Sequence, residues 1–438
     1  MKPSRIAIRA AGAILLALMI QKLLCAQGNL TNADIVLAED MLRGVRDAVK
    51  KNYYDPKYHG VDLDARYKVY EERIKKATNR GATFAEIAAY LSALHDSHTI
   101  FIPPPRLAAF RYGFRMAIIG EKAYITEVRS GSDAAEKLHL GDEILGLNHY
   151  TVNRNDFSDL NYYLYALSPQ TALTFNLRDP LGRQREVSVE TRIEGKGISG
   201  GEQRLWNEIS NNRDVMEHLL RQRWVEQGDL LIWKMPEFSM DNSEVDHMMD
   251  RARKHAALIL DLRGNPGGRV TTLDRMVGDV MDREVTVASR VSRKPEKPDT
   301  AKGRGAFRGK LFVLVDSRSE SASEVFARTM QLEHRGVIVG DRTAGSVMQA
   351  RIYPEHVGVN GLIPYAIEIT DANLIMSDGK SLEGVGVTPD VIVLPTAADL
   401  AAGRDPALAR AAELAGVKLD AAAAGKLFPF EWAPLSAE

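Results

Sequence analysis

The sequence predicts an α/β domain that follows an N-terminal helical segment and a small inserted α+β domain. Apolar residues recur at helical spacing over residues 33–93, short strands and turns fill residues 110–192, and strands alternate with helices from about residue 193. A chain of 438 residues has room for roughly two to three domains. The formal net charge of -1 provides no basic field for nucleic acid, so we expect no nucleic-acid partner.

The first 26 residues have the layout of a secretory signal peptide. Three basic residues precede an apolar run over residues 10–20, which is shorter than the about 20 residues of a membrane span. We therefore expect an exported, periplasmic protein, with an uncleaved N-terminal anchor as the alternative. Cleavage after residue 26 would remove Cys25, the only cysteine, and leave neither a disulfide nor a cysteine nucleophile.

Residues 27–105 are expected to form the helical segment. Apolar residues at spacings of three and four begin at Val36, and residues 63–77 and 84–94 predict two further helices. Thr83 is the expected N-cap of the last helix, because a glutamate follows three residues later. Three consecutive prolines at 103–105 mark the boundary.

Residues 106–192 are expected to form the inserted domain. Strands are predicted at 116–119 and 123–128 and a helix at 133–138, followed by the segment GDEILGLN at 141–148. This segment resembles the G-D-x-I-x-x-[IV]-N signature of PDZ domains, although any small α+β domain with a Gly-Asp turn would also fit. The PDZ resemblance implies peptide binding at Tyr112, Gly113 and Phe114, where only the last two residues match the usual G-L-G-F loop.

Residues 193–438 are expected to form the α/β domain. Strands are predicted at 229–234, 256–262, 310–315 and 337–339, and helices at 244–255 and 323–333. This alternation predicts a mainly parallel sheet, whose ligand sites lie at the carboxyl ends of the strands. Two unusual segments follow such strands: a glycine-rich turn at 263–268 and a serine cluster at 316–324.

Each of these segments has a functional and a structural interpretation. Ser321 at a strand-to-helix junction could be a nucleophile, but serines before a helix are often N-caps, and Ser323 with Glu324 fits that role. The glycine-rich turn could offer amides to a carbonyl or simply join strand to helix. It lacks the G-K-[ST] ending of a phosphate-binding loop.

His98 in the segment 96–99 could act as a general base or be structural. A metal pair with His95 is the third possibility, but the sequence has no H-E-x-x-H motif and no further ligand cluster. We therefore expect neither a metal nor a cofactor.

Taken together, three motifs resemble the family of C-terminal processing (tail-specific) proteases and the tricorn core protease. They are DLRGNPGG at 261–268, SASE at 321–324 and LEGVGVTPD at 382–390. The resemblance extends over roughly residues 35–405. It implies ClpP/crotonase-like βαβ units in the catalytic domain, serine-type peptidase activity on peptides or unfolded proteins, and no cofactor.

The family has two catalytic schemes. The C-terminal processing branch uses a Ser-Lys dyad, and Ser346 stands here at the position of its lysine. The tricorn-like branch uses a Ser-His-Ser-Glu tetrad, whose positions match Ser97, His98, Ser321 and Glu383. The resemblance therefore implies the second scheme, with Lys380 as the one candidate for a substitute lysine base.

The resemblance also implies the role of each residue. Ser321 attacks the carbonyl, His98 transfers the proton, and Glu383 orients His98 through Ser97. The oxyanion hole would combine the amide of Ala322 with one from Gly267 or Gly268.

A non-catalytic module that binds peptides, lipids or retinoids is the alternative on the same fold. In that case Ser321 would cap a helix and His98 would be structural. Labelling by a serine-reactive phosphonate would separate the two functions.

Overall fold

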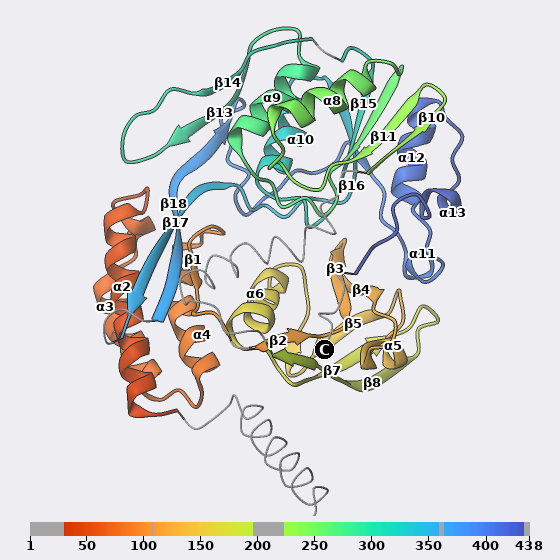
Figure 1. Cartoon of the computed structure of the whole chain (residues 1–438). Helices are drawn as coiled ribbons and strands as arrows, with labels where there is room; N and C mark the ends of the chain where they lie inside the picture. The colour runs from red at the N-terminus through yellow and green to blue at the C-terminus, as the bar shows by residue number, and fades with distance from the viewer. Residues whose placement is uncertain (1–29, 107, 196–222, 306, 359–362, 433–438) are drawn as a thin grey trace, which may run out of the picture.

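The computed structural model describes residues 30–106, 108–195, 223–305, 307–358 and 363–432. The expected signal peptide lies outside these residues. A sheet flanked by helices occupies the upper half of Figure 1, the inserted domain lies beneath it, and a helical segment stands at the left. The predicted mixed α/β fold and N-terminal helical segment are confirmed.

The helical segment comprises three α-helices: α2 (Asn32–Asn52), α3 (Leu63–Lys75) and α4 (Arg80–Leu91). Short 3-10 turns, η1 (Tyr58–Gly60) and η2 (Ser92–Leu94), follow α2 and α4. The N-cap of α4 is Asn79 rather than Thr83, because the Asn79 side chain accepts the Ala82 N–H at 2.9 Å. Thr83 lies buried inside the helix and donates to the Arg80 carbonyl at 2.8 Å.

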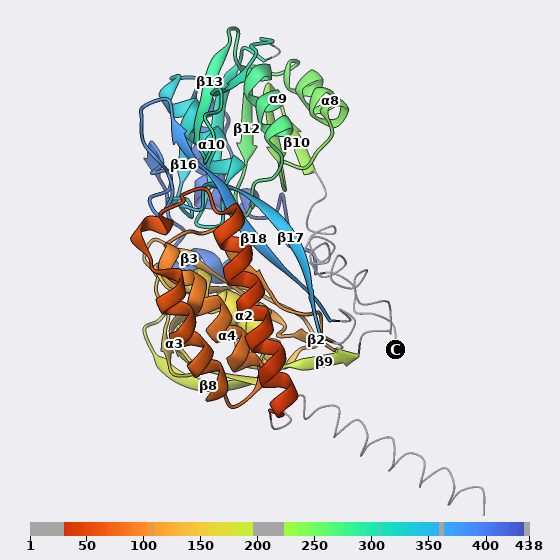
Figure 2. The ribbon, with the colours of Figure 1, turned by 90° about the vertical axis from the view of Figure 1, so that its left-hand side faces the viewer.

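A second sheet, which the sequence patterns did not predict, joins the helices to the expected catalytic domain, whose described part begins at residue 223 and is called the catalytic region. Its strands follow the order β1 (Ile100–Ile102), β18 (Ile363–Met376), β13 (Val285–Val291) and β14 (Asp299–Ala301), and β17 (Met348–Val357) also pairs with β18. Figure 2 shows β17 and β18 running from the upper half down beside α2. Apolar side chains of the helices, β17 and β18 share one core, so β1 and the helices are anchored to the catalytic region.

The inserted domain is built on a sheet in the order β3-β4-β5-β7-β8, with β6 paired to β5. The strands are β3 (Phe114–Ile119), β4 (Lys122–Val128), β5 (Glu143–Leu147), β6 (Tyr150–Thr151), β7 (Ala172–Arg178) and β8 (Gln184–Glu190). Helices α5 (Asp133–Lys137), α6 (Phe157–Tyr162) and the π-helical turn η3 (Tyr163–Leu167) accompany it. Strands β2 (Ala108–Arg111) and β9 (Arg192–Gly195) pair with each other at the domain's entry and exit. One edge of the main sheet is β3.

The catalytic sheet has the order β10-β11-β12-β15-β16-β19 and is parallel except for the β10–β11 pair. Its strands are β10 (Arg223–Gln227), β11 (Leu230–Lys234), β12 (Ala257–Asp261), β15 (Lys310–Val315), β16 (Gly336–Gly340) and β19 (Val391–Ile392). Its inner strands are apolar at consecutive positions because both faces are covered. Leu258 packs into one core and Ile259, the next residue of β12, into the other.

The helices of the catalytic region divide between the two faces. Helices α8 (Asn242–Ala252), α9 (Val270–Val280) and α10 (Ala322–Leu332) share a core with one face. Helices α12 (Pro406–Ala415) and α13 (Ala421–Ala424) pack on the other face, and the short α11 (Ala397–Ala401) precedes them. Helix α10 begins one residue earlier than predicted, with Ser321 rather than Ser323 at the N-cap position.

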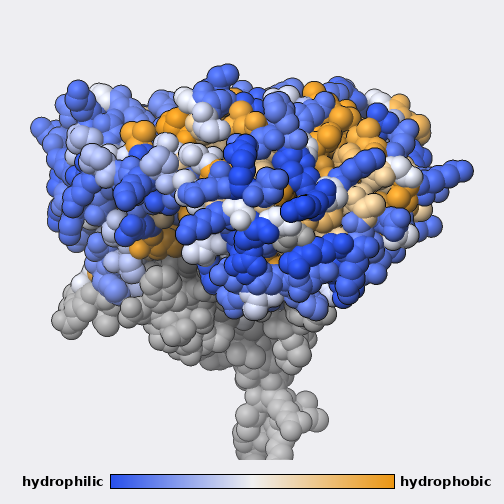
Figure 3. Space-filling view, turned by 90° about the horizontal axis from the view of Figure 1, so that it is seen from above, coloured by the Kyte–Doolittle hydropathy of each residue, from blue (hydrophilic) through white to orange (hydrophobic). Residues whose placement is uncertain are grey.

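The surface seen from above is largely hydrophilic, with smaller hydrophobic areas between the charged side chains (Figure 3). Within the described part of the chain, no helix combines the length and apolar character needed to cross a membrane.

Candidate active site

The candidate site forms where three neighbouring parallel strands end. Strands β12, β15 and β16 lie side by side. Their carboxyl ends lead, in this order, into the glycine-rich turn, the serine cluster at 316–324 (the serine loop) and the segment 341–346. Carboxyl ends of parallel strands meet at one edge of a sheet. Segments that lie up to about 80 residues apart in sequence are therefore in contact here.

Ser321 has a backbone conformation that is rare for a residue with a side chain, with φ 52° and ψ -117°. Such a conformation costs about 1–3 kcal/mol and requires support from its surroundings. Its N–H donates to the Ser346 carbonyl at 2.9 Å and to Glu324 Oε2 at 3.1 Å. Its half-exposed hydroxyl stands at the N-terminus of α10, in a capping box with Glu324, and the dipole of this helix favours developing negative charge.

Glu324 supports this conformation from inside the protein. Its buried carboxylate also accepts hydrogen bonds from Thr343 Oγ1 at 2.5 Å, from the Gly345 N–H at 2.8 Å and from the Ser346 N–H at 2.9 Å. Burial raises the pKa of Glu324 to about 7, against the lowering effect of these donors. The sequence interpretation treated Glu324 only as a capping residue, and its position three residues after Ser321 was the signal that could have revealed this support.

Ser97, His98 and Glu383 form one hydrogen-bonded chain. The Ser97 hydroxyl donates to Glu383 Oε2 at 2.9 Å and lies 2.8 Å from His98 Nδ1. Glu383 also accepts the backbone N–H of Ser97 at 2.8 Å and that of Val347 at 2.8 Å. Because Val347 follows Ser346, whose carbonyl holds Ser321, a single backbone segment anchors both the serine and the glutamate.

The directions of these hydrogen bonds assign the tautomer of His98. Ser97 gives its one hydroxyl proton to Glu383, so it must accept the proton of His98 Nδ1. The other ring nitrogen, Nε2, is then unprotonated and can act as a base. Burial lowers the pKa of His98, and the charge of Asp96 partly opposes this effect. Within the described part of the chain, no hydrogen bond joins His98 to the Ser321 hydroxyl.

Asp96 holds the loop that carries the histidine. Its Oδ1 accepts the His98 N–H at 2.8 Å, the Thr99 N–H at 3.1 Å and the Thr370 hydroxyl at 2.7 Å. The last bond ties the loop to β18. The sequence analysis left Asp96 without a role, although an aspartate two residues before a histidine is a typical start of a tight turn.

The glycine-rich turn packs directly against the serine. A Cβ atom on Gly267 would lie 2.7 Å from Ser321 Cβ and 2.9 Å from the Ala322 nitrogen, so this position excludes any side chain. The Gly267 N–H donates to Asn265 Oδ1 at 2.9 Å and is therefore occupied. The N–H groups of Gly268 and Ala322 have no acceptor among the described residues. Of the two glycine amides predicted for an oxyanion hole, that of Gly268 is the available one.

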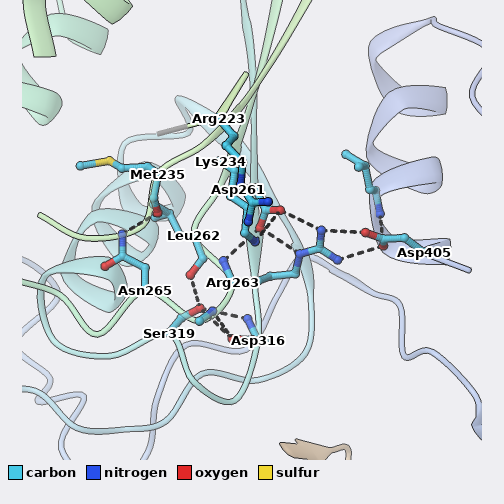
Figure 4. A network of polar contacts seen from close by, with 12 residues as sticks. Arg223, Lys234, Met235, Asp261, Leu262, Arg263, Asn265, Asp316, Ser319 and Asp405 are labelled. Carbon is cyan, nitrogen blue, oxygen red and sulfur yellow. Dashed lines mark hydrogen bonds and ion pairs between the residues drawn. The ribbon is translucent and has the colours of Figure 1, made fainter. Parts of the chain in front are cut away.

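A network of charges fixes the glycine-rich turn (Figure 4). Arg263 binds Asp261 through Nε at 2.9 Å and Asp405 through Nη1 at 2.9 Å. Burial would raise the pKa of Asp261, but Arg263 and Lys234 outweigh this effect and hold it well below its usual range. Asp316 accepts the Gly264 N–H at 2.8 Å and so links the turn to the serine loop.

The remaining predicted residues lie elsewhere or act through their backbone. Lys380 is exposed, and Ser346 contributes its backbone groups to the site. The side chains of Tyr112 and Phe114 belong to the core of the inserted domain, so a peptide could meet only their backbone. Gly113 has φ 75° and leaves no space for a side chain against Ser132. No group of three or more potential metal ligands occurs in the described ranges.

The mixed α/β fold and the chemistry of this strand edge correspond to a serine-type peptidase domain. Residues 229–393 match the family model described as Peptidase family S41, and residues 39–87 match the Tricorn protease C1 domain. Residues 229–393 therefore belong to peptidase family S41, and the predicted family is confirmed.

Individual proteins agree with this assignment. The chain is 24% identical to the tail-specific protease of Haemophilus influenzae over 70% of its own length and 45% of that protein. The structure titled mature CPAF complexed with lactacystin is 16% identical, with a TM-score of 0.62 over 84% of this chain and 96% of that one. The photosystem II D1 C-terminal processing protease is 18% identical, with a TM-score of 0.50 over 83% and 94%. These two structures show a shared fold.

The chain spans less than half of the length of the first curated relatives that it matches, with shares of 45%, 30% and 38%.

Proposed function

We propose that this chain is a serine endopeptidase that cleaves peptide bonds through an acyl-enzyme, with Ser321, His98, Ser97 and Glu383 as its catalytic tetrad. One observation carries the proposal. The hydrogen-bonded chain of Glu383, Ser97 and His98 and the strained Ser321 are anchored to the same backbone segment, 345–347. A base, a group that orients the base, and a half-exposed hydroxyl at a helix N-terminus are the parts that nucleophilic catalysis needs.

The first step forms the acyl-enzyme. Ser321 Oγ attacks the carbonyl carbon while its proton passes to His98 Nε2, and Glu383 stabilises the resulting imidazolium through Ser97. The N–H groups of Ala322 and Gly268 take the oxyanion, a contribution worth about 3 kcal/mol for each donor in comparable sites. The C–N bond then breaks, and the leaving amine receives the proton from His98.

Water completes the reaction. His98 removes a proton from a water molecule that attacks the acyl carbon, the C–O bond to Ser321 breaks, and Oγ regains the proton. No cofactor enters either step. Lys380 has no part in this scheme because it is exposed.

The inserted domain, which we regard as PDZ-like, would present the substrate. Strand β3 is an edge of its sheet, so an extended peptide can be added there by backbone hydrogen bonds. The loop 111–114 precedes this edge and would supply backbone amides to the peptide. We further propose that the N-terminal segment directs export, which fits proteolysis of peptides or unfolded proteins in a periplasm.

The test is proteolysis of an unstructured reporter protein by the purified chain, with phosphonate labelling as a second readout. We expect Ser321→Ala to abolish both cleavage and labelling, and His98→Ala to lower cleavage by at least about 1,000-fold. Lys380→Ala serves as the matched control and should retain full activity. Cleavage that survives His98→Ala would refute the tetrad, and the absence of both cleavage and labelling in the unmodified chain would favour the binding module.

A further inference from the structure

A short aromatic segment of the chain (residues 428–432) lies against three arginines from distant parts of the sequence. Arg223, the first residue of β10, donates from Nη1 to the Pro429 carbonyl at 2.5 Å. Its guanidinium lies 6.0 Å from the centroid of the Phe428 ring, which itself packs on the catalytic core. The aromatic segment is therefore held at its start by the catalytic region.

The other end of the aromatic segment meets the inserted domain. The Arg115 guanidinium lies 4.6 Å from the centroid of the Phe430 ring, and that of Arg129 lies 5.7 Å from the Trp432 ring. The two rings contact each other edge to face, with 5.1 Å between their centroids. Guanidinium groups within about 6 Å of a ring centroid are attracted by its π face. Both rings thus meet a cation of the inserted domain.

These two arginines flank the edge at which we propose that peptides bind. Arg115 belongs to β3, the edge strand, and Arg129 directly follows β4. The Arg129 N–H donates to the Gly113 carbonyl at 2.8 Å, so Arg129 adjoins the loop that precedes β3. The Ser317 hydroxyl of the serine loop donates to the carbonyl of Ile118 on β3 at 2.6 Å, so this strand adjoins the candidate active site.

We propose that the aromatic segment is an intramolecular competitor for the peptide-binding edge, and that Arg115 and Arg129 select peptides with aromatic residues two positions apart. In an extended peptide, side chains two positions apart point to the same side, so both can meet the arginines as Phe430 and Trp432 do. That such peptides are substrates rests on the proposed peptidase function, whereas their binding to this edge is independent of that function.

Binding is measured on the full chain carrying Ser321→Ala, so that cleavage cannot contribute. The probe is a fluorescein-labelled peptide with the sequence of residues 426–432, KLFPFEW, followed by fluorescence anisotropy. Replacing Phe430 and Trp432 by alanine in the chain removes the competitor, and we expect the probe to bind roughly tenfold more tightly. Glu431→Ala is the matched control. Glu431 is exposed and lies between Phe430 and Trp432 in the sequence, so its replacement should leave the affinity unchanged.

Two further measurements make the result decisive. Adding Arg115→Met and Arg129→Met to the alanine variant should remove the gain, and a probe with leucine at both aromatic positions should bind at least about tenfold more weakly. Trp432→Ala alone, which leaves Phe430 in place, provides a second variant if the double variant unfolds. Equal affinity of the unmodified and alanine variants would overturn the competition, and equal affinity for both probes would overturn the selection. Because every variant lacks Ser321, neither outcome bears on the catalytic mechanism.

Discussion

Ser97→Ala is the most informative single change in the candidate site. Among the described residues, the Ser97 hydroxyl alone links His98 Nδ1, at 2.8 Å, to Glu383 Oε2, at 2.9 Å. The glutamate keeps its two backbone donors, from Ser97 and Val347, so the fold should persist. In the Ser97→Ala variant, His98 loses the hydroxyl that accepts its Nδ1–H and sets its tautomer. It also loses its connection to the negative charge of Glu383.

The magnitude follows from the hydrogen bond that strengthens during the reaction. When His98 becomes an imidazolium, its Nδ1–H bond to Ser97 becomes a bond from a charged donor, worth about 1.5–3 kcal/mol. Because about 1.4 kcal/mol corresponds to a factor of ten in rate, we expect kcat/KM to fall about tenfold to a hundredfold. Ser97→Thr keeps the hydroxyl and should restore most of the activity.

The assay is cleavage of a quenched fluorescent reporter at several substrate concentrations, so that kcat and KM are resolved. We expect the loss in kcat, because Ser97 acts on the base and not on the substrate. Ser92→Ala, five residues earlier at the end of α4, is the control for general effects on this region. Full activity of Ser97→Ala, or a loss confined to KM, would refute the relay.

Three further predictions concern the surroundings of the proposed tetrad. Burial lowers the pKa of His98 and Asp96 raises it, so the acidic limb of kcat/KM should lie below pH 6.5, and Asp96→Asn should move it lower still. Glu324→Gln should reduce the free energy of unfolding by about 2–4 kcal/mol in urea, because its amide would face N–H donors, whereas the exposed Glu413→Gln should change little. The folded pKa of Glu324, about 7, lies above the ordinary 4.5, so the folded chain binds more protons between these values. Stability should therefore fall as pH rises from about 5 to 7, and this slope should be shallower in Glu324→Gln, where Glu320, with a pKa also raised to about 7, still contributes. Ser346→Lys should raise the cleavage rate of the His98→Ala variant by at least about tenfold, because a lysine at this position would replace His98 as the base. The measurement is the cleavage rate of both variants across pH.

Local pattern predicted the regular elements of the catalytic sheet well. The strand expected at 310–315 coincides with β15, and that at 256–262 contains β12. Such strands are apolar at most consecutive positions because helices cover both faces, and this signal needs no knowledge of their neighbours. The long strands β17 and β18 were not predicted, because their buried and more exposed residues follow one another without one clear period.

Some residues of the candidate site could also be predicted from local sequence, and others could not. The serine before α10 and the glycine-rich turn follow from strand-to-helix junctions that can be recognised in the sequence. The family resemblance implies that Ser346 stands at the position of a lysine. The pairing of Ser97 with Glu383 spans 286 residues, and no local signal connects them. The same holds for Glu324, whose four donors come from two chain segments that meet only in the folded protein.

The sequence by itself determined the peptidase family, the helical segment and the strand ends at which the chemistry is concentrated, because these depend on periodicity and short motifs. Only the tertiary structure decided which amide of the glycine-rich turn is free, which tautomer His98 adopts and where the aromatic segment lies. The tautomer and the aromatic segment depend on contacts between distant segments, such as Ser97 with Glu383 and Arg115 with Phe430. The free amide depends on how the folded turn directs the Asn265 side chain to the Gly267 N–H. Local propensity carries no information about such contacts, since they arise only when the packed sheets fix the relative positions of their loops.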